Sequence, residues 1–284
     1  MRGSQPASRF DEASSDRGAA VSYDDQASRF DERVGLLDDA VTAFTSAIMD
    51  EGKAGPGQLV VEIGAGTGRL GAALIVAGVR YIGIDSSGAM LERFRDRLPL
   101  GKEPALLIQS DANRAWPVAD RAAQVVFGLR SIHHLAPGHA SREILRVLRP
   151  GGVLLIGRIE RGSESLHALM RQRMHELMRA HGFVPRKAGV ANAALIDQLA
   201  QSGCDVLPAR VLATWPLARS PKRLIADWAS KQGLGGLTLP DAAKRAILAD
   251  LSAWAAGAFQ DVDAPLPWEE RLVCSGARLA GAPT

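Results

Sequence analysis

Three acidic residues stand at or near the ends of three predicted strands in the first half of the chain. Glu62 lies near the end of the first apolar segment, Asp85 ends the second, and Asp111 ends the third. The carboxyl ends of parallel strands share one edge of an open α/β sheet, which is where such sheets bind ligands. The sequence therefore predicts a row of carboxylate oxygens along one sheet edge.

A glycine-rich turn follows the first of these strands, with Gly64, Gly66 and Gly68 in the segment V-E-I-G-A-G-T-G. Glycine lets the backbone turn sharply and approach a ligand closely. A helix that starts after such a turn offers free N–H groups and the positive end of its dipole. Asp85, 21 residues after Gly64, has the spacing of a carboxylate that binds a ribose diol. Together these features predict a nucleotide-like cofactor.

The spacing of Gly66, Gly68 and Gly71 also spells G-x-G-x-x-G, so a nicotinamide-dependent oxidoreductase is an alternative. Glu62 argues against it, because a carboxylate next to a diphosphate is unfavourable. An acid at this position instead suits a ligand that carries an ammonium group. A second alternative is a protein of the same fold that binds the cofactor without transferring a group from it.

Two histidines, His133 and His134, follow the fourth predicted strand. Histidine titrates near neutral pH, so either is a candidate general base, with His134 preferred. The alternative is that they only pack or hydrogen-bond locally. We expect His139 to face solvent in a loop, and His167 and His175 to lie on the surface of a helix.

Apolar segments alternate with helical patterns up to residue 160, which predicts a parallel sheet covered on both faces. The fold class is therefore α/β, with a Rossmann-like, doubly wound sheet. A turn signal, R-P-G-G at 149–152, closes a predicted helix. The predicted strands are 59–63, 81–84, 105–108, 124–129 and 153–156, and the predicted helices are 37–50, the segment up to 77, 89–98 and 141–148.

The pattern changes after residue 160, where long helical stripes separate two further extended segments, 206–217 and 271–279. Inserted helices of this length commonly form a lid or a substrate wall. We expect helical lid insertions at about 161–182 and 220–258. The stripe that contains Met170, Met174 and Met178 is either lid core or an adaptable pocket wall. We divide the chain into a disordered tail (1–22), an N-terminal helical cap (23–57) and the main domain (58–284).

Composition limits the remaining function classes. The chain has 284 residues, 46% of them hydrophobic and 23% charged, with a net charge of +3. This composition excludes bulk disorder, and the charge is too balanced to indicate a nucleic-acid partner. No apolar run is long enough for a membrane span. Because Cys204 and Cys274 form neither a disulfide framework nor a zinc site, we expect a cytoplasmic location and no metal.

In order and spacing, these motifs resemble the class I S-adenosylmethionine-dependent methyltransferases, and within them the ubiquinone/menaquinone-type (type 11-like) small-molecule group. E-I-G-A-G-T-G at 62–68 matches the family's cofactor motif, and L-R-P-G-G at 148–152 matches the turn before its fifth strand. The segment around Tyr23, Phe30 and Arg33 resembles the family's region before the first helix. The resemblance covers about residues 23–160 strongly.

This resemblance implies a seven-stranded, mostly parallel sheet with an antiparallel last strand. It implies methyl transfer from S-adenosylmethionine, which becomes S-adenosylhomocysteine, to an oxygen, nitrogen or carbon nucleophile of a small hydrophobic metabolite. Asp85 would bind the ribose, Asp111 the adenine amine by its side chain, and Ala112 the adenine by its backbone. The cofactor-binding residues that it implies are Tyr23, Phe30, Arg33, Glu62, Gly64, Ala65, Gly66, Gly68, Asp85, Ser86, Met90, Asp111, Ala112 and Leu129.

The same resemblance allows the substrate to contact Arg158 and Glu160, which follow the fifth strand. We expect these two residues to form a solvated ion pair in a loop instead. Four of the five tryptophans lie after residue 210, and we expect them to belong to the core of the lid, with one or two lining the pocket. The substrate, the acceptor atom and the oligomeric state are not predicted by the sequence.

Overall fold

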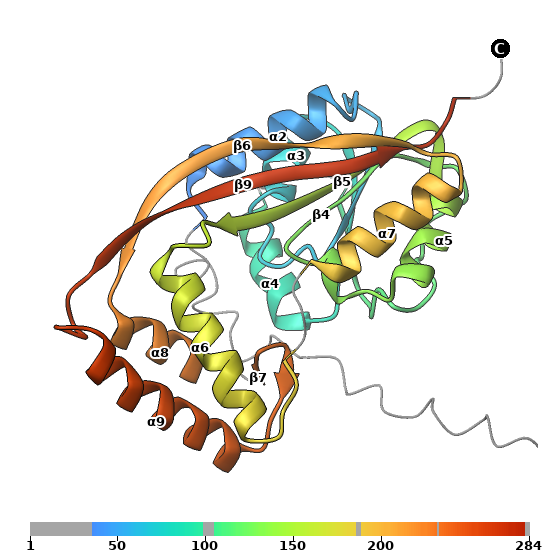
Figure 1. The fold of residues 1–284 in the computed structure, drawn as a ribbon. Helices are drawn as coiled ribbons and strands as arrows, with labels where there is room; N and C mark the ends of the chain where they lie inside the picture. The colour runs from blue at the N-terminus through green and yellow to red at the C-terminus, as the bar shows by residue number, and fades with distance from the viewer. Residues whose placement is uncertain (1–35, 99–104, 186–188, 232, 282–284) are drawn as a thin grey trace, which may run out of the picture.

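The computed structural model describes residues 36–98, 105–185, 189–231 and 233–281 (Figure 1). The predicted tail at 1–22 and the predicted cofactor contacts Tyr23, Phe30 and Arg33 lie outside these ranges.

A seven-stranded sheet forms the centre of the molecule, in the order β3-β2-β1-β4-β5-β9-β6. Strand β9 runs antiparallel to both of its neighbours, and the remaining pairs are parallel. The predicted sheet with an antiparallel last strand is therefore confirmed. The strands are β1 (Leu59–Ile63), β2 (Arg80–Asp85), β3 (Ala105–Gln109), β4 (Ala123–Leu129), β5 (Leu148–Arg161), β6 (Asp205–Arg219) and β9 (Leu266–Arg278).

Helices cover both faces of this sheet, because its central strands are apolar on both sides. Buried residues of α2 (Asp38–Asp50), α3 (Gly71–Val76) and α4 (Gly88–Arg97) share one core cluster with the sheet. Those of α5 (Pro137–Val147) and α7 (Val190–Gln201) belong to a second cluster. Strand order reverses between β1 and β4, and such a switch point opens a crevice at the carboxyl ends of the strands.

Several boundaries differ from those expected. Strand β5 starts at Leu148 and continues to Arg161, so the R-P-G-G turn lies inside it. The N–H of Gly151, at φ 78°, donates to the carbonyl of Leu279, which keeps the turn in the sheet. Arg158 and Glu160 therefore lie on a strand, and the expected loop is wrong. Their ion pair is present, with 2.7 Å between Nη2 and Oε1.

A second helical layer extends from the sheet where the strands β6 and β9 arch away from it (Figure 1). It contains α6 (Leu166–Ala180), α8 (Pro221–Ala229) and α9 (Asp241–Ala258), with a short hairpin of β7 (Gly233–Leu234) and β8 (Leu237–Thr238). We call α6, α8 and α9 the helical insertion. Met170, Met174 and Met178 are buried in its own hydrophobic core, so the stripe is core and not an open wall.

Two expectations about the insertion need correction. His167 is half-buried and packs edge-on against Trp228, with ring centroids 5.7 Å apart, and His175 is also half-buried. Leu169, by contrast, is 46% exposed. Of the four late tryptophans, Trp215 belongs to the sheet core rather than to the insertion. Within the described ranges no helix is long and apolar enough to cross a membrane.

Candidate functional site

The glycine turn after β1 has the backbone geometry that only glycine adopts easily. Gly64, Gly66 and Gly68 have φ values of 73°, 54° and 79°. A Cβ at Gly68 would lie 2.1 Å from the ring of Phe94, and one at Gly64 would lie 2.4 Å from Cβ of Ser131. The turn is therefore pressed against its surroundings, and a side chain at either position would displace it.

The Asp85 carboxylate connects the ends of β1 and β2. Its Oδ2 accepts the Gly66 N–H at 2.8 Å, and its Oδ1 accepts the Ser87 N–H at 2.9 Å. The Ser87 hydroxyl then accepts the Met90 N–H at 3.2 Å and so caps α4. Asp85 therefore fixes the glycine turn and the start of α4 relative to each other.

Glu62 lies beneath the turn, 3% exposed, and accepts a hydrogen bond from the hydroxyl of Tyr81. Burial raises the pKa of Glu62 to about 8; the Tyr81 hydrogen bond opposes this shift and the charge of Asp85 adds to it. Burial and Glu62 together raise the pKa of Tyr81 well above its ordinary value, so Tyr81 remains the donor. The sequence argument treated Glu62 as an ionised acid, and this assumption is wrong. With a pKa of about 8, the carboxyl is mostly neutral at pH 7.

Asp111 lies in the loop after β3, half-buried, and only its Oδ1 is engaged within the described chain. This oxygen accepts the backbone N–H of Asn113 at 2.9 Å and its side-chain amide at 3.3 Å. The carbonyl of Ala112 accepts the indole N–H of Trp116 at 2.9 Å, which fixes the loop. Oδ2 of Asp111 and the N–H of Ala112 therefore remain for a ligand.

His133 and His134 lie on a 3₁₀ turn, η2 (Ile132–His134), after β4. Both are exposed, and their ring centroids are 4.0 Å apart. Surrounding protein atoms, then the charges of His134 and Arg130, lower the pKa of His133 to about 4. Arg130, which precedes the turn, has a left-handed φ of 62°, a strained conformation that is common at functional sites. His139 lies on α5, so the expected loop is wrong. Its side chain is half-buried, with Nε2 2.9 Å from the carbonyl oxygen of Arg114.

The remaining predicted contacts lie along the same edge. Ala65 is buried under the turn, Ser86 is exposed beside Asp85, and Met90 is 2% exposed at the start of α4. Leu129 is half-buried at the end of β4. The sequence analysis missed four residues that contact motif residues but lie outside the motifs themselves: Tyr81, Phe94, Asn113 and Ser131. Only Tyr81 carried a signal, as a polar-tipped residue in an apolar strand.

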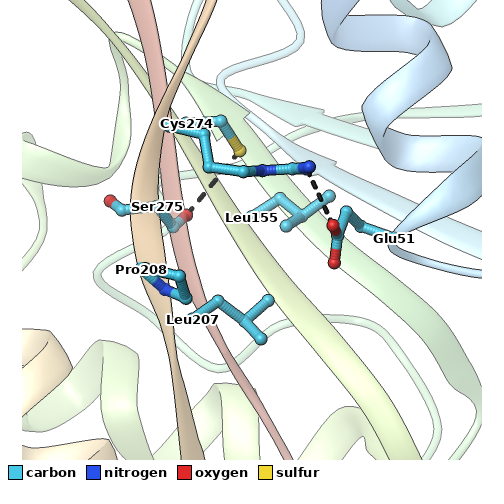
Figure 2. A pocket seen from close by; sticks show the side chains of 7 residues that line it. Glu51, Leu155, Leu207, Pro208, Cys274 and Ser275 are labelled. Atoms are coloured by element: carbon cyan, nitrogen blue, oxygen red, sulfur yellow. Dashed lines mark hydrogen bonds and ion pairs between the residues drawn. The ribbon is translucent and has the colours of Figure 1, made fainter.

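A small cavity of about 50 Å³ lies elsewhere, between α2 and the strands β5, β6 and β9 (Figure 2). Arg210 and Glu51 form an ion pair of 2.9 Å on its wall. Burial raises the pKa of the Cys274 thiol to about 11, so the thiol is not a nucleophile at neutral pH. The cavity has room for a few water molecules and is much smaller than a ligand site.

The chain is also similar to known methyltransferases over the segment that forms this edge. Residues 61–156 match the family model described as a methyltransferase domain. The demethylmenaquinone methyltransferase of Renibacterium salmoninarum is 33% identical over 141 residues, which cover 48% of this chain and 56% of that protein. The segment 61–156 is therefore similar to methyltransferase domains. Gly66, Gly68 and Gly71 lie inside the matched segment, which favours a methyltransferase motif over a dinucleotide fingerprint.

Solved structures match the fold of this chain over most of its length. The YcgJ protein of Bacillus subtilis matches with a TM-score of 0.51 and 20% identity, over 84% of this chain and 98% of that one. The [4+2]-cyclase SpnF matches with a TM-score of 0.50 and 20% identity, over 86% and 82%. At this identity the two structures show the fold alone. The chain spans only 35% to 56% of the curated relatives that it matches.

The raised pKa of Glu62 predicts a pH-dependent stability. The folded chain keeps a proton on Glu62 up to about pH 8, whereas the ordinary pKa of a glutamate side chain, which applies to the unfolded chain, is 4.5. The folded state therefore binds more protons between these values, and the free energy of unfolding falls as pH rises, by at most about 1.4 kcal/mol per unit. Glu62→Gln cannot titrate and should lose this slope.

Urea unfolding at several pH values between about 5 and 8 measures this slope. Glu160→Gln, which removes an exposed carboxylate from β5, is the matched control and should keep the wild-type slope. An unchanged slope in Glu62→Gln would show that Glu62 is ionised in the folded chain.

Proposed function

We propose that this chain is an S-adenosylmethionine-dependent methyltransferase that acts on an oxygen, nitrogen or carbon nucleophile of a small hydrophobic metabolite. The observation that carries the proposal is the Asp85 carboxylate at the sheet edge, which accepts the Gly66 N–H of the glycine turn and the Ser87 N–H before α4. The match of residues 61–156 to a methyltransferase domain supports it independently.

The residues at this edge fit such a cofactor. Asp85 would accept the ribose hydroxyls, and Oδ2 of Asp111 with the N–H of Ala112 would bind the adenine edge. The glycines of the turn have positive φ values and no side chains. The backbone of the turn can therefore come close to the amino-acid part of the cofactor. A positive charge beside Glu62 would lower its pKa and favour the carboxylate, so the ammonium group of the cofactor would be bound with release of a proton. Tyr23, Phe30 and Arg33 stay predicted contacts.

The bound cofactor would supply a sulfonium methyl group as the electrophile. The chain's main contribution is to hold donor and acceptor in line, which supplies roughly 7–11 kcal/mol in well-oriented reactions. A base is needed only where the acceptor must lose a proton. His134 is the better candidate, because a pKa of about 4 makes His133 a weak base at neutral pH.

A second candidate is a protein that binds the cofactor without transferring its methyl group. The [4+2]-cyclase SpnF has the same fold, so the fold alone does not decide between the two candidates. A further part of the proposal is that the helical insertion acts as a lid over the acceptor. The cytoplasmic location, the absence of a nucleic-acid partner and the absence of a metal stay predictions from composition.

Calorimetric titration with S-adenosylhomocysteine tests the cofactor assignment. The wild type should bind, and Asp85→Ala should weaken the affinity by about 10- to 100-fold, because charge-assisted hydrogen bonds are lost. Asp96→Ala removes an exposed carboxylate from α4 and should bind like the wild type. No binding to the wild type, or full binding to Asp85→Ala, would contradict the assignment.

The histidine pair is tested by the rate at which S-adenosylhomocysteine is released with an acceptor found by screening. If the acceptor loses a proton, His134→Gln should lower kcat by about 10²- to 10⁴-fold, and His133→Gln should lower it less. Wild-type rates in both variants would remove the pair from the mechanism and point to an acceptor that needs no base.

A further inference from the structure

The strand end where β5 leaves its parallel partner carries an arginine that is held on one side only. Nε of Arg161 donates to Oε1 of Glu270 at 2.6 Å. The Glu270 side chain is 4% exposed and that of Arg161 is 29% exposed. Within the described chain the two Nη groups of Arg161 make no hydrogen bond. A buried carboxylate thus fixes the guanidinium through Nε, while the side chain stays partly exposed. The two Nη groups form the edge with which arginine binds carboxylates and phosphates in bidentate fashion.

Two buried tryptophans lie on the same face of the sheet as this arginine. Arg161, Glu270 and Trp215 stand opposite one another on β5, β9 and β6, so they lie in one row on one face of the sheet. Trp268 lies on the same face two residues before Glu270. The indole N–H groups of Trp215 and Trp268 are buried and have no hydrogen-bond partner among the described residues.

The junction between the sheet and the helical insertion is also cationic. His167, on α6, has its pKa lowered to about 3, first by burial and then by the charges of Arg161, Arg171 and Lys231. His167 is therefore neutral, and three cations act on it from β5, from α6 and from the segment after α8. Glu160 and Glu269 lie on the opposite face of their strands and pair with Arg158 and Arg271.

The position of Arg161 relates it to methyl transfer. It lies at the carboxyl end of β5, on the same sheet edge as Asp85 and the histidine pair, because β1, β2, β4 and β5 are parallel. Gly157, paired with Leu129, is the last β5 residue joined to β4. Arg161 lies four residues further on, about 13 Å along the strand. An extended small molecule can span this distance.

We propose that Arg161, held by Glu270, anchors an anionic oxygen group, a carboxylate or a phosphate, at the far end of the methyl acceptor. This inference rests on the proposed function and specifies its acceptor. The acceptor then combines an apolar body with an anionic end and presents its nucleophile about 13 Å away, near the end of β4.

Calorimetry with three matched probes tests the anchor: octanoate, octyl phosphate and octanamide, each titrated with and without saturating S-adenosylhomocysteine. The wild type should bind at least one of the two anions at least tenfold more tightly than the neutral amide, and the better anion distinguishes a carboxylate site from a phosphate site. Arg161→Gln should lose this preference. The Arg161→Gln/Glu270→Gln double variant, which leaves no unpaired buried charge, should lose it too and serves if the single variant fails to fold.

Arg158→Gln removes a cation from the opposite face of the same strand and should keep the preference. Equal affinity for anion and amide, absence of anion binding to the wild type, or a preference that survives in the double variant would overturn the proposal. Binding of S-adenosylhomocysteine is measured in the same samples. Its absence would refute the proposed function, whereas its presence without an anion preference would refute only the anchor.

Discussion

The site depends on one carboxylate that serves two backbone segments at once. Asp85 accepts the Gly66 N–H from the turn after β1 and the Ser87 N–H from the turn before α4. Each buried donor left without its acceptor would cost about 1–3 kcal/mol, so the side chain fixes the relative position of both turns. The glycines make this arrangement possible, because a Cβ at Gly68 would meet Phe94 at 2.1 Å. The ligand-binding edge is therefore set before any ligand arrives, which lowers the entropy cost of binding.

A second polar contact lies beneath the first and is fully enclosed by protein. Glu62 and Tyr81 share a hydrogen bond between β1 and β2, with the Tyr81 ring packed edge-on against Phe94 at 5.6 Å between centroids. The carboxyl escapes the cost of a buried charge by remaining protonated. The same side chain can become an anion when a cation is placed beside it. The contact between Glu62 and Tyr81 thus holds β1 against β2 and also sets the charge of the carboxyl beneath the glycine turn.

The sequence predicted the fold of the chain up to residue 160 well, because this part is built from short motifs with fixed spacing. The parallel strands, the glycine turn and the positions of Asp85 and Asp111 at one edge all follow from alternating elements and from the parallel-strand rule. The protonation of Glu62 could not be predicted, because it depends on how deeply the folded chain buries the carboxyl. It also depends on the hydrogen bond from Tyr81, which lies 19 residues away in the chain.

For the part of the chain after residue 160, the sequence predicted helices and strands but no binding site. The inserted helices and the two late strands were expected near the positions where they occur, yet the methionine stripe could equally have been a pocket wall. The row of Arg161, Glu270 and Trp215 is formed by residues up to 109 positions apart that come together only through strand register. No pattern of neighbouring residues in the sequence predicts such a row. The loop expected at Arg158 and Glu160 was wrong because pairing with β9 extends β5 well past its apolar segment.

The central claim is that the edge formed by the glycine turn, Asp85 and Asp111 binds S-adenosylmethionine. Hydrogen–deuterium exchange of the full chain with and without S-adenosylhomocysteine tests it most directly, since exchange locates binding along the backbone. The account predicts slower exchange in residues 63–71, 84–91 and 110–113, with little change in α9. Unchanged exchange in these three segments, or protection confined to another part of the chain, would contradict it.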